Sequence, residues 1–154
     1  MNHRCFKKTG IGRIGIEENG TAVVRLYLPG ETPDNACASE EETPLLREAF
    51  RQLQEYCGQK RKDFDLPLAP RGTAFMQRVW AELRRIPYGE TVSYKTVAER
   101  TGRPKACRAV GQANHRNPIA IFIPCHRVVA ADGTLGGYGG GLEMKQRLLE
   151  LESR

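Results

Sequence analysis

The chain has 154 residues, 40% of them hydrophobic, and its 24 Lys and Arg against 18 Asp and Glu give a net charge of +6. This length predicts one domain, or one domain with a small appendage; no apolar run approaches the ~18 residues that a membrane span needs, and no signal-peptide pattern opens the chain. Five cysteines without CxxC spacing argue against a disulfide framework and a zinc ribbon, so we expect a reducing, cytoplasmic environment.

Residues 1–30 have the pattern of a small antiparallel sheet. Apolar and polar positions alternate over residues 21–28, which is typical of a half-buried strand. Asn19-Gly20 before this segment is a hairpin-turn signal, and the partner strand can come from Ile11, Ile14 and Ile16. Residues 29–42 are polar, acidic and rich in turn-forming residues, which indicates a loop.

A helix is predicted after this loop. Thr43-Pro44 supplies an N-cap residue and a proline at the first helical position. Apolar residues follow at helical spacing up to Gly58, namely Leu46, Ala49, Phe50, Leu53 and Cys57. Residues 64–72 contain two prolines and indicate a linker. We therefore predict a small N-terminal α+β domain over residues 1–66 and a mostly helical domain over residues 67–154.

The second domain begins with three predicted helices. Thr73 can cap the first, which Pro87 ends, and residues 93–100 form the second. Gly102 stops that helix and Pro104 starts the third, whose small and apolar face consists of Ala106, Ala109, Val110 and Ala113. Two short helices joined by a glycine-containing turn are typical of a helix-turn-helix, and a plain helical hairpin is the alternative.

The charge of this region favours DNA as its partner. Between residues 71 and 116 there are ten Lys or Arg against three Glu. Polar and basic residues also lie off the small face of the third helix, namely Lys105, Arg108 and Gln112. A positive field of this kind suits a polyanion.

The stretch from Ile121 to Val129 carries a candidate nucleophile. Its apolar start predicts a buried strand, and Pro124 fixes the backbone next to Cys125. The thiol would lie beside the imidazole of His126 and the guanidinium of Arg127, and cationic neighbours favour the reactive thiolate. The alternative is a small, buried and unreactive cysteine.

A glycine-rich loop and a last helix complete the chain. Residues 136–141 contain five glycines but lack the GK[ST] ending of a phosphate-binding loop, so no nucleoside triphosphate is expected. Such a loop lets backbone N–H groups approach a ligand closely. Residues 142–151 predict an amphipathic helix, and candidate partners for a histidine in and beside it are Glu143, Glu150 and Glu152.

Five motifs in this order resemble the O6-alkylguanine-DNA alkyltransferases, also called methylated-DNA–protein-cysteine methyltransferases. They are DFDLP at 63–67, IPYGE at 86–90, RAVG at 108–111, NP at 117–118 and IPCHRV at 123–128. The last motif with these companions is highly specific, whereas the first sixty residues add only a compatible hairpin-plus-helix pattern. The resemblance implies an α+β fold of two lobes, with a DNA-binding helix-turn-helix in the C-terminal one.

The resemblance also implies DNA repair in a single turnover. Cys125 would take an alkyl group from O6 of guanine, or less readily from O4 of thymine. Nothing in the sequence offers a way to regenerate the free thiol from the resulting thioether. His126 would act through a water as base for the thiol, and Glu152 would orient the imidazole, so that a positioned base activates a weak nucleophile. Tyr94 would give a proton to the leaving purine, and Asn117 would brace the turn before the cysteine.

The implied substrate is a nucleotide extruded from duplex DNA, because O6 of guanine lies inside the base stack. Arg108 would fill the vacated space while the third helix enters the minor groove. The other DNA contacts implied are Tyr94, Lys105, Ala106, Ala109, Gln112 and Arg127. The implied base pocket consists of Pro118, Val128, Gly136, Tyr138 and Gly139. We expect a monomer without a cofactor.

Three positions depart from the family pattern. Asp65 stands where zinc-binding relatives have histidine, so we predict that no metal is bound. Gly139 replaces a serine, which leaves the backbone as the expected donor to O6. Ala120 replaces the proline of some relatives at a site that bears on the width of the pocket.

Three other classes of protein are alternatives. A non-enzymatic lesion binder of the alkyltransferase-like type would lack the cysteine, which is present here. A helix-turn-helix regulator would need polar, base-reading side chains where the third helix has alanines. A cysteine hydrolase would need an oxyanion site and repeated turnover.

Overall fold

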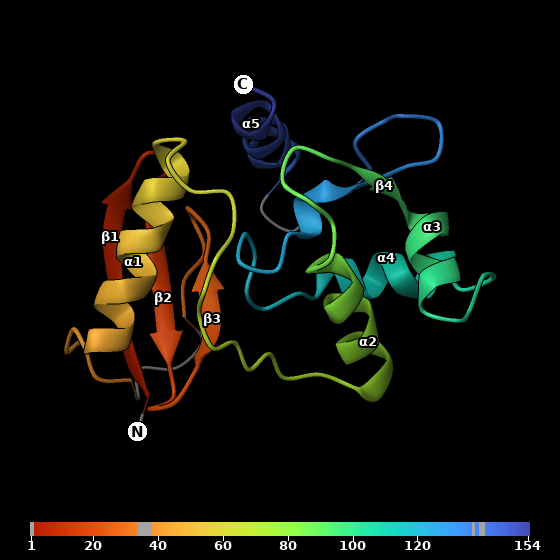
Figure 1. Cartoon of the computed structure of the whole chain (residues 1–154). Coiled ribbons are helices and arrows are strands. Elements are labelled where there is room, and N and C mark those ends of the chain that lie inside the picture. The colour runs from red at the N-terminus through yellow and green to blue at the C-terminus, as the bar shows by residue number, and fades with distance from the viewer. Residues whose placement is uncertain (1, 34–37, 137, 139–140) are drawn as a thin grey trace. The chain divides into compact units, whose positions relative to one another are not determined.

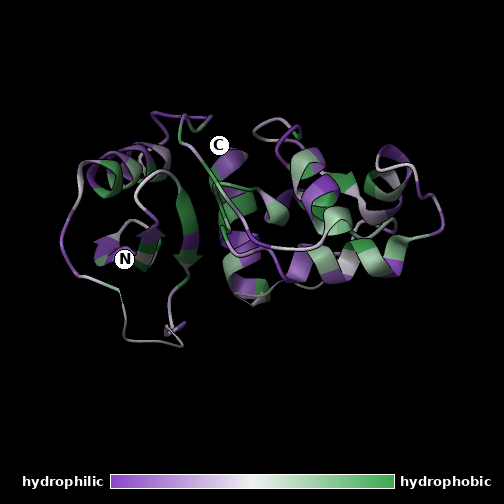
Figure 2. Ribbon diagram, turned by 90° about the horizontal axis from the view of Figure 1, so that it is seen from below, coloured by the Kyte–Doolittle hydropathy of each residue, from purple (hydrophilic) through white to green (hydrophobic). Residues whose placement is uncertain are grey.

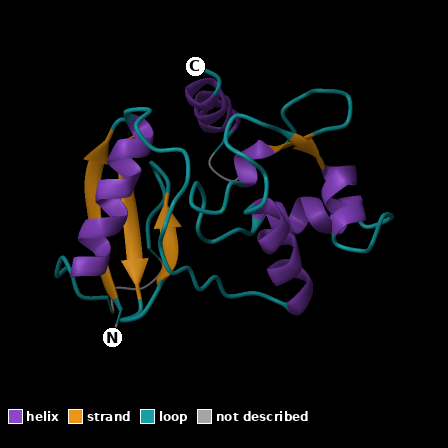
Figure 3. Ribbon diagram, in the orientation of Figure 1, coloured by secondary structure: helices purple, strands orange, loops and turns teal. Residues whose placement is uncertain are grey.

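The structure is a computed structural model that describes residues 2–33, 38–136, 138 and 141–154. The chain divides into two compact units, Met1–Pro70 and Arg71–Arg154. The larger sheet belongs to the first unit, and most helices belong to the second (Figure 3). This is the α+β class that the sequence predicts. In the described part of the chain, no helix is long and apolar enough to cross a membrane.

The first unit is built on a three-stranded antiparallel sheet. Strands β1 (His3–Thr9), β2 (Gly12–Glu18) and β3 (Val23–Tyr27) pair in the order β1-β2-β3. The predicted turn at Asn19-Gly20 joins β2 to β3. Asn19 Oδ1 accepts hydrogen bonds from the backbone N–H groups of Thr21 and Ala22 at 3.0 and 2.9 Å, and Gly20 takes a φ of 101°, which glycine tolerates.

Helix α1 (Pro44–Cys57) packs on β1 and β2 (Figure 1). Thr43 caps it as predicted, because the hydroxyl accepts a hydrogen bond from the backbone N–H of Leu46 at 3.2 Å. The buried side chains of the helix and sheet form the core of this unit, namely Ile14, Ile16, Leu26, Leu46, Ala49, Phe50 and Leu53.

The segment predicted as a linker contributes to the first unit. The backbone N–H of Val23 donates to the carbonyl of Pro67, and that of Ala69 donates to the carbonyl of Val23, both at 2.8 Å. These bonds extend the sheet beyond β3. The first compact unit consequently runs to Pro70.

The second unit contains, in chain order, α2 (Ala74–Leu83), β4 (Val92–Ser93), α3 (Tyr94–Arg100), α4 (Cys107–His115), the 3₁₀ helix η1 (Cys125–Arg127), β5 (Val128–Val129) and α5 (Leu142–Glu152). The helices carry hydrophobic and hydrophilic bands (Figure 2), as expected of helices with one buried face. Trp80 is 1% exposed, and its Nε1 donates to the carbonyl of Ala113 at 2.8 Å. This bond fixes α2 against α4.

Helices α3 and α4 form the predicted helix-turn-helix, with one correction. The prediction that Pro104 starts the second of these helices is wrong, because α4 begins at Cys107. Residues 103–106 first close a turn in which the N–H of Ala106 donates to the carbonyl of Arg103 at 2.9 Å. Lys105 and Ala106 therefore precede α4 instead of lying within it.

The stretch before Cys125 is a turn and not the predicted buried strand. Ile123 N–H donates to the carbonyl of Ile119 at 2.9 Å, and Ile121 takes a φ of 75°, which is rare for a β-branched residue. The side chain of Asn117 supports this turn: Oδ1 accepts from Ile119 N–H at 3.0 Å and Nδ2 donates to the Ile123 carbonyl at 2.8 Å. The strand in this region, β5, follows the cysteine and pairs in parallel with β4.

Candidate active site

Cys125 is the first residue of η1 and is only 4% exposed. Its backbone N–H donates to the Ile123 carbonyl at 2.8 Å, and its own carbonyl accepts from Asn114 Nδ2 at 3.2 Å. Burial raises the pKa of the thiol, and the Asn117 amide and the charge of Lys145 partly oppose this effect. The thiol is therefore the resting form, and a base must take its proton before the sulfur can attack.

Arg127, two residues after Cys125, does not supply the positive charge that the sequence suggested would favour the thiolate of Cys125. The residue is 5% exposed, and its Nε and Nη2 donate to Glu152 at 2.8 and 3.0 Å. Its Nη1 donates to the carbonyl of Ile86 at 2.7 Å. The carboxylate offsets the guanidinium charge at close range. The DNA contact predicted for Arg127 is also inconsistent with this burial, and the residue instead orients Glu152.

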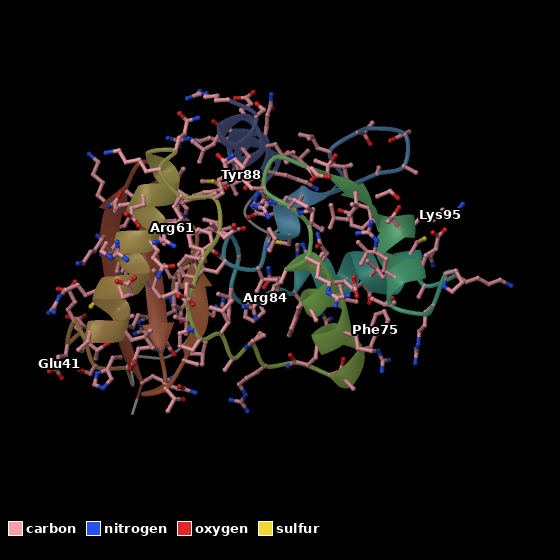
Figure 4. All side chains as sticks on the ribbon, in the orientation of Figure 1. Glu41, Arg61, Phe75, Arg84, Tyr88 and Lys95 are labelled. Atoms are coloured by element: carbon pink, nitrogen blue, oxygen red, sulfur yellow. The ribbon has the colours of Figure 1, made fainter. Side chains whose placement is uncertain are left out.

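Glu152 lies at the centre of a buried polar cluster that we define as Glu152, His126, Arg127 and Gly89. The carboxylate also accepts from Gly89 N–H at 3.3 Å and contacts His126 Nε2 at 2.6 Å. Gly89 takes a φ of 81°, and a Cβ on it would lie 3.2 Å from the backbone oxygen of Glu152, which explains the glycine of the IPYGE motif. Tyr88, labelled in Figure 4, places its ring centroid 5.8 Å from Arg127 Cζ.

The cluster leaves His126 as a neutral imidazole with one nitrogen available. Burial lowers the pKa of His126, although Glu152 opposes this effect. Because a carboxylate only accepts hydrogen bonds, Nε2 carries the proton in its contact with Glu152, and Nδ1 carries the lone pair. Nδ1 is buried and has no hydrogen-bonding partner among the described residues. The imidazole therefore has the tautomer that a base requires.

Tyr94 lies close to the same site at the start of α3. Gly136 approaches it so closely that a Cβ there would lie 3.0 Å from Tyr94 Oη. Lys145 Nζ lies 5.8 Å from the ring centroid. Burial and the charge of Cys125 raise the pKa of the phenol, and a side-chain hydrogen bond with Asn114 lowers it; the net shift is upward. Tyr94 is therefore protonated and can act as an acid.

Lys145 is a buried cation in the active site that the sequence did not reveal. Its ammonium donates to the carbonyl of Val128 at 2.6 Å and to that of Leu135. Burial lowers its pKa, and the charge of Cys125 acts in the opposite direction. Lys145 lies three residues before Leu148, so both side chains share the buried face of α5.

The remaining residues predicted for the base pocket are placed as follows. Val128 is fully buried in β5, and Tyr138 is 8% exposed. Pro118 is half-buried in the turn that Asn117 supports. Gly139 lies outside the described residues. The structure thus brings Cys125, Tyr94, Gly136 and Tyr138 to one place.

The residues predicted to contact DNA lie mostly at the surface. On α4, Arg108, Ala109 and Gln112 are exposed, and Lys105 is exposed in the turn before it, where Ala106 is half-buried. Lys95 projects outward from α3 in the same helix-turn-helix (Figure 4). Among the described residues, no group of three or more His, Cys, Asp or Glu side chains is placed to hold a metal ion.

Comparisons with known proteins match both units. The family model of the 6-O-methylguanine DNA methyltransferase ribonuclease-like domain matches residues 4–70, and that of the 6-O-methylguanine DNA methyltransferase DNA binding domain matches residues 74–154. The constitutive methylated-DNA–protein-cysteine methyltransferase of Bacillus subtilis (strain 168) is 46% identical over 160 residues, which cover 99% of this chain and 96% of that protein. The methylated-DNA–protein-cysteine methyltransferase of Methanosarcina acetivorans is 53% identical over 122 residues, 79% of this chain and 76% of that protein.

A solved structure of a related protein has the same fold as this chain. The Mycobacterium tuberculosis OGT, crystallised in complex with DNA, superposes with a TM-score of 0.92 at 42% identity, covering 98% of this chain and 92% of that one. Fold and site therefore define a two-domain protein with a DNA-binding domain and a buried reactive cysteine. The chain belongs to the 6-O-methylguanine DNA methyltransferase family. The resemblance drawn from the five motifs is thus confirmed, and the matches extend it to the first seventy residues.

Proposed function

We propose that this protein repairs alkylated duplex DNA by moving one alkyl group, typically methyl, from O6 of guanine to its own Cys125. O4 of thymine would be a poorer donor. The observation that carries this proposal is the buried Cys125 thiol in one site with a neutral His126, whose Nδ1 has no partner among the described residues. A protonated Tyr94 beside them provides the acid.

The base half of the reaction uses the Glu152 cluster. Arg127 and Gly89 hold the carboxylate, and the carboxylate holds Nε2 of His126. Nδ1 then takes the thiol proton through a water, so that Sγ attacks as the thiolate. The charge of Lys145 and the amide of Asn117 stabilise the thiolate while it exists.

The transfer itself is a displacement at the alkyl carbon. A bond forms between this carbon and Sγ of Cys125 while its bond to O6 breaks, and the bonding electron pair passes into the purine. Tyr94 gives its proton to the departing guanine, which leaves as the neutral base. The product is a thioether, which is a poor leaving group, so each chain acts once.

Access to O6 requires the damaged nucleotide to leave the base stack, at a cost of a few kcal/mol. Arg108, exposed on α4, fills the space that the nucleotide vacates, and Ala109 allows close approach to the minor groove. Lys105 and Gln112 contact the adjacent backbone. The protein acts as a monomer in the cytoplasm, where reducing conditions keep Cys125 as a thiol.

A restriction assay tests this function. A duplex carries O6-methylguanine within a restriction site, so that the nuclease cuts only after guanine is restored. We expect the wild-type protein to restore cutting in proportion to the amount of protein added. A lesion binder would bind the duplex and restore nothing, and a hydrolase would restore an excess of duplex with catalytic amounts of protein. Either result would refute the proposal.

A further inference from the structure

The sheet of the first unit has one face that points away from α1. Ile14 and Ile16 of β2 belong to the core shared with α1, and Lys7 of β1 lies on the same side, its ammonium 5.2 Å from the ring centroid of Phe50 in that helix. Because side chains alternate along a strand, the residues between them point to the opposite face. The strand pairing places on that opposite face Arg4, Phe6 and Lys8 of β1, Arg13, Gly15 and Glu17 of β2, and Arg25 and Tyr27 of β3.

Positive charge is concentrated on these eight residues, which we call the basic face. They include four Lys or Arg and one Glu. The first unit as a whole, residues 1–70, has ten Lys or Arg against eleven Asp or Glu, which gives a net charge of −1. Lys8 and Arg13 are exposed, and Arg25 is half-buried. The charge of the basic face is therefore a local excess and does not follow from the composition of the unit.

Two aromatic rings lie beneath guanidinium groups of the basic face. The rings of Phe6 and Tyr27 flank Gly15 with their centroids 5.6 Å apart, and a Cβ on Gly15 would clash with the ring of Phe6. Arg13 Cζ lies 5.2 Å from the centroid of Phe6, and Arg25 Cζ lies 4.9 Å from that of Tyr27. A guanidinium held over a ring keeps its N–H donors in its own plane, where they can bind the oxygens of a phosphate.

Arg13 and Arg25 have no carboxylate partner among the described residues. Arg4, by contrast, lies 3.0 Å from Glu17, so that the one acid of the basic face offsets a buried arginine. Lys8 likewise forms no ion pair in the described part of the chain. The charges that remain for a ligand are those of Lys8, Arg13 and Arg25.

We propose that the basic face is a second DNA-binding surface, on which Lys8, Arg13 and Arg25 bind phosphates of the DNA backbone. Three cations without carboxylate partners suit a polyanion, and both rings are already in contact with guanidinium groups and do not read bases. The polyanion is duplex DNA, because the same chain carries a DNA binding domain and a bound duplex raises the local concentration of phosphates. This surface adds affinity without sequence preference.

The first test measures the binding of undamaged duplex DNA by fluorescence anisotropy over a range of salt concentrations. Arg13→Gln/Arg25→Gln should reduce the slope of log K against log salt by about 2, since each phosphate contact contributes about 0.9. The matched control, Arg47→Gln/Lys60→Gln, removes two exposed cations of the same unit that lie outside the basic face, and it should leave the slope unchanged. An unchanged slope in the first variant, or the same change in both, would overturn the inference.

Lysine footprinting of the wild-type protein gives an independent result. Duplex DNA should slow the acetylation of Lys8 by an N-hydroxysuccinimide ester several-fold and leave that of Lys60 unchanged, although both side chains are exposed in the free protein. Equal acetylation of Lys8 with and without DNA would overturn the inference. Undamaged duplex carries no alkyl group, so these results do not depend on the transfer reaction. A protein that shows both effects but transfers no methyl group would refute the proposed function alone.

Discussion

Replacing Glu152 with Gln should destabilise the second unit by about 3–5 kcal/mol, which is the usual cost of removing one partner of a buried ion pair. The Glu152 side chain is 1% exposed and that of Arg127 is 7% exposed, with contacts of 2.8 and 3.0 Å between them. Gln keeps the shape of the side chain but leaves the buried guanidinium without its counter-charge. His126 also loses the carboxylate that fixes its tautomer, so methyl transfer should slow by about a hundredfold.

Urea unfolding followed by tryptophan fluorescence measures this loss. Trp80 is the only tryptophan, is 1% exposed and belongs to the same unit as Glu152. The matched control is Glu82→Gln, whose carboxylate contacts the exposed Arg85 at 3.5 Å and should change the free energy of unfolding by less than about 1 kcal/mol. A Glu152→Gln protein that loses no more stability than Glu82→Gln would refute the role assigned to the Glu152 cluster.

Three further outcomes are expected. DNA binding should be largely independent of sequence and should weaken steeply with salt, because the ten-to-three basic excess between residues 71 and 116 acts through phosphate contacts; an anisotropy titration that is flat in salt would contradict this. Arg108→Ala should slow repair in duplex DNA much more than transfer from free O6-benzylguanine, since only the duplex reaction needs an extruded nucleotide, and equal losses would assign Arg108 to the chemistry or the fold. Burial lowers the pKa of His126, so the unfolded chain binds more protons below about pH 6.5 and the unfolding free energy reported by Trp80 should fall from about pH 7 to 5. His126→Gln should reduce that fall, and an unchanged fall would place its source elsewhere.

Local signals in the sequence predicted the local structure well. Asn19-Gly20 and Thr43 act through hydrogen bonds to residues within three positions of themselves, so their effects can be read from neighbouring residues. The prediction at residues 121–124 was wrong because a side chain intervened. The amide of Asn117 supplies hydrogen bonds that an apolar run would otherwise obtain from an adjacent strand.

The electrostatics of the site could not be read from adjacency along the chain. Arg127 is two residues from Cys125, yet its charge is offset by Glu152, 25 residues further on. The cation that acts on the thiol is Lys145, 20 residues further along the chain than Cys125. Lys145 is a polar residue on the buried face of α5, a position that helical spacing alone does not mark as part of the site. Its partners are the carbonyls of Val128 and Leu135, which come from other segments and depend on the three-dimensional fold.

The fate of one methyl group tests most directly whether Cys125 is the acceptor in a single-turnover transfer. The protein is incubated with an excess of duplex containing O6-methylguanine, and intact mass and peptide mapping then count and locate the methyl groups on it. We expect one group per chain, on Cys125, with no recovery of activity on prolonged incubation, and none on Cys125→Ala, which should still bind DNA. A methyl group on another cysteine, or several repaired duplexes per chain, would contradict the account.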